Sequence, residues 1–123
     1  MRMWMVNVKT MCRKHLLGEH VECHMIVGSI NKSKNLEGFV DRNCLQFKSI
    51  YTRHNALAKE MIRRGYNHKS PIEKINWLKG NKVTLKVLAS KVNQKLSEKD
   101  LYGRCKDCRD LAQKLKKPLA KLF

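Results

Sequence analysis

The chain has 123 residues and carries 27 Lys and Arg against 10 Asp and Glu, giving a formal net charge of +17 and a pI near 10.0. Hydrophobic residues make up 42% of the sequence, enough to build one modest core, which excludes a disordered basic tail. Such an excess of positive charge predicts a polyanionic partner, with nucleic acid the commonest and an acidic membrane surface the competing alternative.

The sequence has no segment typical of membrane insertion or secretion. Its longest apolar runs span about three or four residues, too short for a transmembrane helix or for the apolar core of a signal peptide. The five cysteines are an odd number and do not suggest a secreted disulfide scaffold. We therefore expect one domain over residues 1–123, with reduced thiols and no membrane contact, in the cytoplasm (the host cytosol if a phage carries the gene).

The first predicted helix begins after Thr10, its expected N-cap, and ends at about residue 26 or 27, with Gly28 as its stop. Apolar residues at helical spacing form a stripe along it: Cys12, Leu16, Cys23 and Val27. His15, Glu19 and Glu22 fall at i, i+4 and i+7, so they share another face of this helix.

Residues 31–46 are polar and basic, which predicts a long loop, and loops of this length in compact domains are often functional. Ser49 then caps a second helix that ends with Arg63, Arg64 and Gly65, where cations suit the helix dipole. Its apolar side repeats at i, i+4, i+7 and i+11: Ile50, His54, Leu57 and Met61.

A third, short helix is predicted from Ser70 to about Gly80. Ser70 is a capping residue, Pro71 suits the first helical position, and Glu73 lies three residues after the cap. A further helix is indicated by apolar residues at helical spacing: Leu85, Leu88, Val92 and Leu96.

Ser97 and Asp100 are expected to cap the last helix, and Pro118 to end it. One side of that helix carries small and apolar residues: Leu101, Cys105, Cys108, Ala112 and Leu115. Strand-like alternation is nearly absent, so we predict an all-α fold, a compact single domain of four to five helices.

The acidic residues of the first helix are its most informative feature. Glu19 and Glu22 are the only acids in the first 36 residues, and both share a face with His15. An ordinary structural interpretation is that Glu19 forms an ion pair and Glu22 is solvated. The pattern alone leaves this interpretation and a chemical role equally open.

Three segments carry a resemblance to a known family: Met1-Arg2, residues 15–22 (HLLGEHVE) and residues 63–67 (RRGYN). In this order, over the first 70 or so residues, they resemble the pyrimidine dimer DNA glycosylases of the phage endonuclease V type. The resemblance implies a small, basic, all-helical protein that cuts the glycosidic bond at ultraviolet-induced pyrimidine dimers in duplex DNA. It also implies a second step that nicks the abasic strand without a metal or other cofactor.

The resemblance also implies which groups carry the chemistry. The family's nucleophile is the α-amino group of the mature N-terminus followed by an arginine, which Met1 and Arg2 supply here, and Glu22 matches its essential glutamate. An α-amine titrates close to neutral pH, so part of it is neutral and able to form a Schiff base. The family's recognition arginines are replaced by Val21 and by His24 or Met25, so the resemblance extends less to lesion recognition than to catalysis.

We expect Arg2, His15 and Glu19 to support the catalytic groups. Cations on helix ends and in the basic loop are candidates for phosphate contacts, which fix register without reading sequence: Arg2, Arg13, Lys14, Lys32, Lys34, Arg42, Arg53, Arg63, Arg64 and Lys69. Trp4 and Trp77 are expected in the core, because large apolar rings seek burial.

Cys105 and Cys108 have the C-x2-C spacing of a zinc ligand pair, which Cys23 or His24 could complete. A single pair is a weak signal, and both cysteines lie on the apolar side of the last predicted helix, where buried thiols need no metal. We therefore assign no metal and no cofactor, and leave the question of zinc at these two cysteines open.

The leading hypothesis is thus a monomeric DNA repair glycosylase and abasic-site lyase that uses the Met1 amine and Glu22. The alternative is a non-enzymatic helical DNA-binding protein, with a helix-turn-helix within Leu85 to Leu111. A metal-dependent nuclease is disfavoured, because clustered Asp, Glu and His ligands are scarce.

Overall fold

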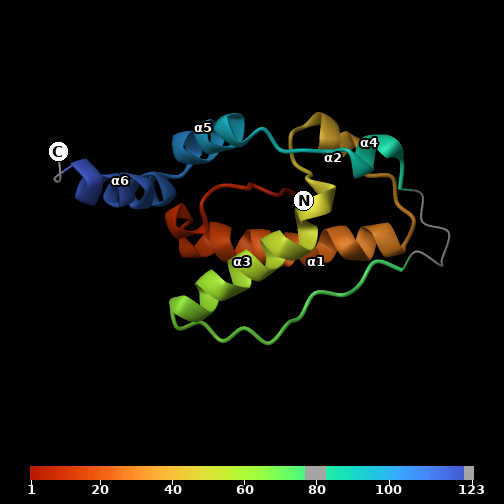
Figure 1. The fold of residues 1–123 in the computed structure, drawn as a ribbon, viewed down its shortest axis with the longest axis horizontal. Helices are drawn as coiled ribbons and strands as arrows, with labels where there is room; N and C mark the ends of the chain where they lie inside the picture. Colours follow the sequence, from red (N-terminus) through yellow and green to blue (C-terminus); the bar gives the residue numbers. More distant parts are fainter. Residues whose placement is uncertain (77–82, 121–123) are drawn as a thin grey trace.

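The computed structural model describes the backbone of residues 1–76 and 83–120 and the side chains of residues 1–76 and 83–115. Within these ranges the chain is helical and contains no strand, which confirms the predicted all-α class (Figure 1). The elements in chain order are η1 (Val8–Thr10), α1 (Arg13–Asn31), α2 (Glu37–Asp41), η2 (Phe47–Ser49), α3 (Ile50–Arg63), α4 (Leu85–Leu88), α5 (Gln94–Arg104) and α6 (Lys106–Ala120). Over the described residues, no helix is both long and apolar enough to cross a membrane.

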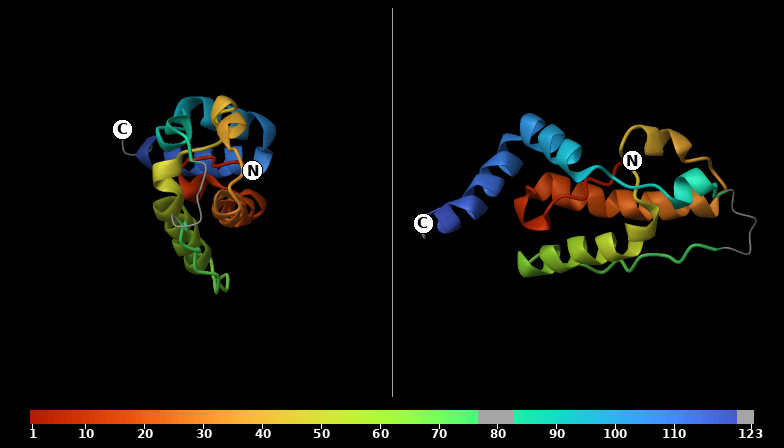
Figure 2. Two further views of the ribbon diagram at one scale, coloured as in Figure 1. Left: turned by 90° about the vertical axis from the view of Figure 1, so that its right-hand side faces the viewer. Right: turned by 45° about the horizontal axis from the view of Figure 1, so that its top comes forward.

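Helices α1 and α3 form the centre of the fold and pack against each other (Figures 1 and 2). The short helices α2 and α4 contact each other near the C-terminal half of α1, while α5 and α6 contact each other toward its N-terminal half (Figure 1). The segment before α1 runs along these helices, and its η1 turn contacts both α3 and α6. Residues far apart in the sequence therefore meet around α1.

The buried apolar side chains form two clusters, and α1 contributes to both. One cluster gathers the C-terminal half of α1 with the residues around α2, η2 and α4, and includes Met3, Ile26 and Ile30. The other gathers the N-terminal half of α1 with α3, α5 and α6, and includes Trp4 and Leu16. Trp4 is buried as predicted, whereas Trp77 lies outside the described residues.

The first helix differs from its prediction at both ends. Thr10 belongs to η1 rather than capping α1, and Cys12 occupies the N-cap position without a side-chain hydrogen bond. The helix passes through Gly28 and ends at Asn31, so the predicted stop at Gly28 is wrong. Gly28 lies within α1 and does not have the positive φ that often ends a helix. Among the described glycines, that conformation is found at Gly65.

The second predicted helix is confirmed as α3. Ser49 is its N-cap residue, and the chain turns out of the helix at Gly65 with a φ of 85°, a value that favours glycine. The preceding predicted loop, residues 31–46, contains the short helix α2. The predicted loop is therefore partly helical.

The helix predicted from residue 70 to residue 80 is not formed in its described part, which has no regular secondary structure up to residue 76. The backbone groups of this segment pair with side chains of α1 and α3 instead of with one another. Tyr51 Oη accepts from the Ile75 N–H at 2.8 Å, and Asn31 Oδ1 accepts from the Asn76 N–H at 2.7 Å. The rest of the predicted helix lies outside the described residues.

The predicted boundaries after residue 83 are also wrong. The helix expected from Leu85 to Leu96 is a single turn, α4, and α5 begins after Asn93, whose side chain accepts from the Leu96 N–H. Ser97 lies inside α5 and donates its hydroxyl to the Trp4 carbonyl at 2.5 Å. In the candidate helix-turn-helix segment, α5 and α6 are separated by one residue, not by the three- to four-residue turn of that motif.

The end of the last helix differs as well. Pro118 was expected to stop it, but the bounds of α6 extend to Ala120 and include this proline. The apolar spacing from Leu85 to Leu96 also predicted burial incorrectly, because Leu85 is 82% exposed and Leu96 is 57% exposed. Burial in this region follows contacts with α1 and the N-terminal segment more than local periodicity.

Glu60 near the end of α3 provides a pH-dependent contribution to stability. Arg63 Nε donates to its Oε1 at 2.7 Å and Arg64 Nε to its Oε2 at 2.8 Å, and these contacts, Arg63 first, lower the pKa of Glu60 from 4.5 to about 2. Because this pKa is depressed in the folded state, the carboxylate stabilises the fold above about pH 4.5, and the contribution is lost as pH falls through about 2.

We expect Glu60→Gln to lower the thermal unfolding midpoint at neutral pH and to flatten its decline between about pH 4.5 and 2. Thermal unfolding followed by circular dichroism over this range measures both effects. Glu73→Gln, at an exposed acid, is the matched control and should keep the acid decline of the unmodified protein. An equally steep decline in Glu60→Gln would show that other groups cause it.

Candidate active site

The side chain of Glu22 lies on α1 beside the N-terminal end of the chain. The Arg2 backbone N–H and the N-terminal ammonium group both lie close enough to its carboxylate to stabilise the charged form. Burial raises the pKa of Glu22 above its ordinary value, and the nearby charge of Glu19 adds to this, while the ammonium group and Arg2 oppose it. The structure thus brings the Met1 amine and the Glu22 carboxylate into one site.

Arg2 holds the N-terminal segment in this place through its side chain. The guanidinium lies 3.7 Å from the centre of the Trp4 ring, and Nη1 pairs with Asp100 of α5 at 2.6 Å. Met3 anchors the same segment on the other side, because its N–H donates to the Cys44 carbonyl at 2.7 Å. The position of the amine is therefore fixed by contacts with two distant parts of the chain.

A surface depression adjoins Arg2. Residues from the N-terminal segment, the stretch after α2 and α5 line it: Arg2, Arg42, Asn43, Cys44, Leu96, Asp100 and Arg104. Asp100 pairs with both Arg2 and Arg104, whereas Arg42 is exposed and offers its charge to solvent. The sequence analysis did not identify Arg104 as part of this surface, because only the fold brings α5 to the N-terminus.

Glu19 has a structural environment different from that of Glu22. Its carboxylate is 1% exposed and receives two hydrogen bonds from Arg53 of α3, from Nε at 2.5 Å and from Nη2 at 2.9 Å. Arg53 Nη1 also donates to the Val6 carbonyl at 2.6 Å. The prediction of a phosphate contact at Arg53 is therefore wrong, because this guanidinium is buried and engaged.

His15 lies among thiols rather than in contact with Glu22. Its Nδ1 is 3.2 Å from Cys12 Sγ and 3.6 Å from Cys108 Sγ, and its ring meets the edge of Trp4. Together with Cys105, whose Sγ is 3.8 Å from Cys12 Sγ, these residues form what we call the thiol–imidazole cluster. All four potential ligand atoms lie within 4.8 Å of one another.

The partners suggested from sequence for Cys105 and Cys108 do not join them. Cys23 is buried in the apolar core, and burial raises the pKa of its thiol to about 12. His24 belongs to a second group, the histidine cluster, with rings from α1, α3 and the following segment: His20, His24, His54 and His68. Burial and the neighbouring imidazoles lower the pKa of His20 to about 4, so this residue is neutral at pH 7.

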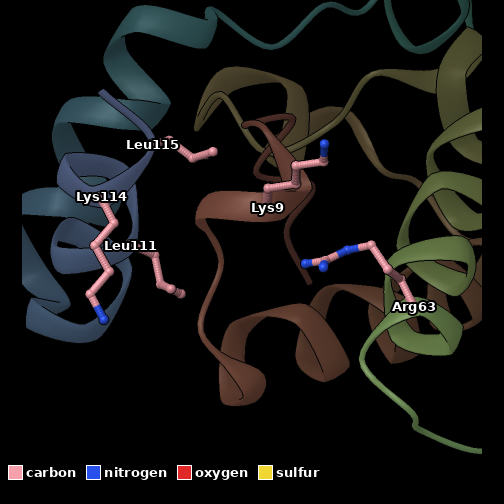
Figure 3. A pocket seen from close by; sticks show the side chains of 5 residues that line it. All are labelled: Lys9, Arg63, Leu111, Lys114 and Leu115. Atoms are coloured by element: carbon pink, nitrogen blue, oxygen red, sulfur yellow. The ribbon is translucent and has the colours of Figure 1, made fainter. Parts of the chain in front are cut away.

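Most of the cations predicted to contact phosphate are exposed: Arg13, Lys14, Lys32, Lys34, Arg42, Arg63 and Lys69. Arg64 is partly buried between the Glu60 carboxylate and the Val8 carbonyl, and Arg2 is engaged as described above. Figure 3 shows a second depression, lined by Lys9 of η1 and Arg63 of α3 on one side and by Leu111, Lys114 and Leu115 of α6 on the other. Lys9 and Lys114 were not among the cations predicted from the sequence.

Two apolar residues near Glu22 in the sequence of α1 are exposed. Val21 is 53% exposed and Met25 is 51% exposed, so neither contributes to the core. The resemblance implied arginines at Val21 and at His24 or Met25.

Comparison with known proteins gives one informative result. A family model described as pyrimidine dimer DNA glycosylase matches residues 1–74, which include Met1, Arg2, α1, α3 and the Glu22 site. No match was found among curated proteins or among solved structures. Because the family match spans more than half of the chain, the protein belongs to the pyrimidine dimer DNA glycosylase family, whose substrate is DNA.

Proposed function

We propose that this glycosylase acts on pyrimidine dimers in duplex DNA and then cleaves the abasic strand by β-elimination. The Met1 amine is the nucleophile, Glu22 is the catalytic carboxylate, and neither step uses a metal or cofactor. The observation that supports this most directly is the half-buried Glu22 carboxylate, which lies close to the Arg2 backbone N–H and to the N-terminal ammonium group.

The reaction begins when the neutral Met1 amine attacks C1′ of the damaged nucleotide, and the base leaves with the electrons of the glycosidic bond. Opening of the sugar ring and loss of a proton from nitrogen give a protonated Schiff base at C1′. Loss of a proton from C2′ then breaks the C3′–O bond and expels the phosphate. Hydrolysis of the remaining imine releases the free amine.

Glu22 is suited to two parts of this sequence. As a carboxylate it stabilises the positive charge that develops on the sugar, and in its neutral form it returns protons during ring opening and elimination. Because the pKa of Glu22 is raised, the neutral form is more populated than it is for an ordinary glutamate at the same pH. Because C1′ is shielded in duplex DNA, the protein must distort the helix or flip a nucleotide to reach it.

We propose that exposed cations beside the N-terminus and at the end of α3 hold the DNA backbone, with the chain acting as a monomeric single domain in the cytoplasm. Arg42 borders the depression next to Arg2, and Lys9, Arg63 and Lys114 line the one in Figure 3. Such phosphate contacts position the protein without reading bases. The exposed Val21 and Met25 beside Glu22 favour contacts with bases or sugars over contacts with phosphate.

Borohydride trapping tests the nucleophile. With ultraviolet-irradiated duplex DNA and EDTA added for the assay, borohydride should reduce the Schiff base to a stable adduct between the protein and the cut strand. A two-residue extension before Met1 should abolish the adduct, because it converts the reactive amine into an amide. The same extension placed after Phe123 is the matched control and should leave trapping unchanged.

Two results would contradict the proposed chemistry. If neither irradiated nor abasic DNA gives an adduct with the unextended chain, the amine does not form the expected intermediate. If strand cutting requires added Mg²⁺, a metal-dependent nuclease becomes the better explanation. DNA binding without base release would instead favour the non-enzymatic alternative.

A further inference from the structure

The thiol–imidazole cluster has the geometry of a tetrahedral metal site. With Zn–S bonds near 2.3 Å and Zn–N bonds near 2.0–2.1 Å, a tetrahedral arrangement separates two sulfurs by about 3.8 Å and sulfur from nitrogen by about 3.5 Å. The observed separations are 3.8 Å between Cys12 Sγ and Cys105 Sγ, and 3.2 and 3.6 Å from His15 Nδ1 to two thiols. These distances place the four atoms around a point that one ion can occupy.

The sequence spacing around the cluster suits this geometry. Cys12 and His15 are separated by two residues at the beginning of α1, and Cys105 and Cys108 are separated by two residues at the junction of α5 and α6. Backbone N–H groups also point at the sulfurs, since Cys12 N–H donates to Cys108 Sγ at 3.1 Å. Hydrogen bonds of this kind stabilise thiolate ligands.

Two simpler explanations of the cluster fit less well. A packed group of buried thiols accounts for Cys108, which is fully buried, but not for an imidazole nitrogen directed at two sulfurs. A disulfide needs a sulfur–sulfur distance of about 2.05 Å, and the three cysteines of the cluster are all free. The 3.8 Å between Cys12 and Cys105 leaves room for an ion between them instead.

We propose that the protein binds one structural Zn²⁺ ion through four ligands: Cys12 Sγ, His15 Nδ1, Cys105 Sγ and Cys108 Sγ. On binding, each of the three thiols loses its proton, and neutral His15 supplies the Nδ1 lone pair while its proton remains on Nε2. Three thiolates and Zn²⁺ together carry one negative charge. Exposed cations next to the ligands, Arg13, Lys14, Lys106 and Arg109, offset it.

The ion links two parts of the chain that are far apart in sequence. It joins the beginning of α1, the helix that carries Glu22, to the junction of α5 and α6, which lies beyond the residues that match the family. All four coordination positions are filled by protein, which is typical of a structural site and not of a catalytic one. The site is therefore independent of the metal-free chemistry proposed at Met1.

Zinc content and cobalt spectroscopy of the full-length chain test this site. The protein purified under reducing conditions should contain one zinc per chain, and replacement by Co²⁺ should give the visible bands of a tetrahedral cobalt–thiolate site. Cys105→Ser should lose the bound zinc and these bands. Cys44→Ser is the matched control, because Cys44 is also a partly exposed free thiol but lies outside the cluster.

A second variant keeps the test decisive if Cys105→Ser does not fold. His15→Cys should retain one zinc, with a cobalt spectrum altered by a fourth thiolate, and Zn²⁺ added to the metal-free unmodified chain should raise its unfolding temperature. Zinc that persists in Cys105→Ser without cobalt–thiolate bands would place the ion at the histidine cluster and overturn the proposal. A Cys12–Cys105 disulfide, or no bound zinc in the unmodified chain, would overturn it as well.

Discussion

Glu22→Gln is expected to reduce base release by about 10²- to 10⁴-fold while leaving the protein folded and able to bind DNA. The amide has nearly the same shape as the carboxylate, but it neither stabilises the cationic sugar nor exchanges the protons needed for elimination. Glu22 is not part of the buried ion pair between α1 and α3, so the substitution leaves that pair intact. The loss should therefore fall on the rate and not on the affinity.

Single-turnover glycosylase assays and equilibrium DNA binding at fixed salt separate these effects. Glu73→Gln removes the same charge from an exposed position and should keep full activity. Full activity in Glu22→Gln would remove this residue from the mechanism. A parallel loss of activity and of DNA binding would instead indicate that Glu22 organises the DNA-binding surface.

Removing one partner of the buried Glu19–Arg53 pair is expected to be the most damaging change to stability. Glu19→Gln leaves the Arg53 guanidinium uncompensated in the interior, which costs about 3–5 kcal/mol, a large part of the about 5–15 kcal/mol that stabilises a typical domain. Urea unfolding should show a lower midpoint at an unchanged slope. At temperatures where the variant stays folded, its glycosylase rate should change far less than that of Glu22→Gln.

The double variant Glu19→Leu with Arg53→Met separates loss of the pair from exposure of an unpaired charge. Replacing both partners removes the uncompensated charge and should recover much of the stability lost in Glu19→Gln. Recovery should be incomplete, because the Val6 carbonyl loses its hydrogen bond from Arg53, which costs about 1–3 kcal/mol. If the double variant is less stable than Glu19→Gln, the pair has a net stabilising role beyond charge compensation.

Local sequence signals were reliable where one helix carries all of them. α3 has its N-cap residue, its apolar repeat and its terminal glycine within one segment, and it forms close to where these signals place it. The capping pattern at Ser70 and Glu73 is as complete, yet the described residues after it form no helix. Here side chains of α1 and α3 bond the backbone of the segment, and a pattern confined to residues 70–80 contains no information about such partners.

The residues of the candidate site were also predicted only in part, because a local pattern contains no information about distant partners. The resemblance placed Met1 and Glu22, and the structure brings them together, but no local pattern distinguishes Arg53 from the exposed arginines. The buried position of Arg53 depends on its partner Glu19, which lies on a neighbouring helix and 34 positions earlier in the sequence. The thiol–imidazole cluster left a clearer trace, since its two pairs each have a two-residue spacing. In the first pair, however, the pattern favoured an apolar helix stripe for Cys12 and a supporting role for His15.

The presence of α1 in both hydrophobic clusters has a consequence for how the molecule opens. If α2 and α4 detach, Leu16 still holds α1 against α3 and α5, and if α5 and α6 detach, Ile26 and Ile30 still hold it at the other end. Partial unfolding at either end therefore leaves α1 docked. Glu22 lies between these two sets of contacts, so its backbone amide should exchange with solvent among the slowest in the protein.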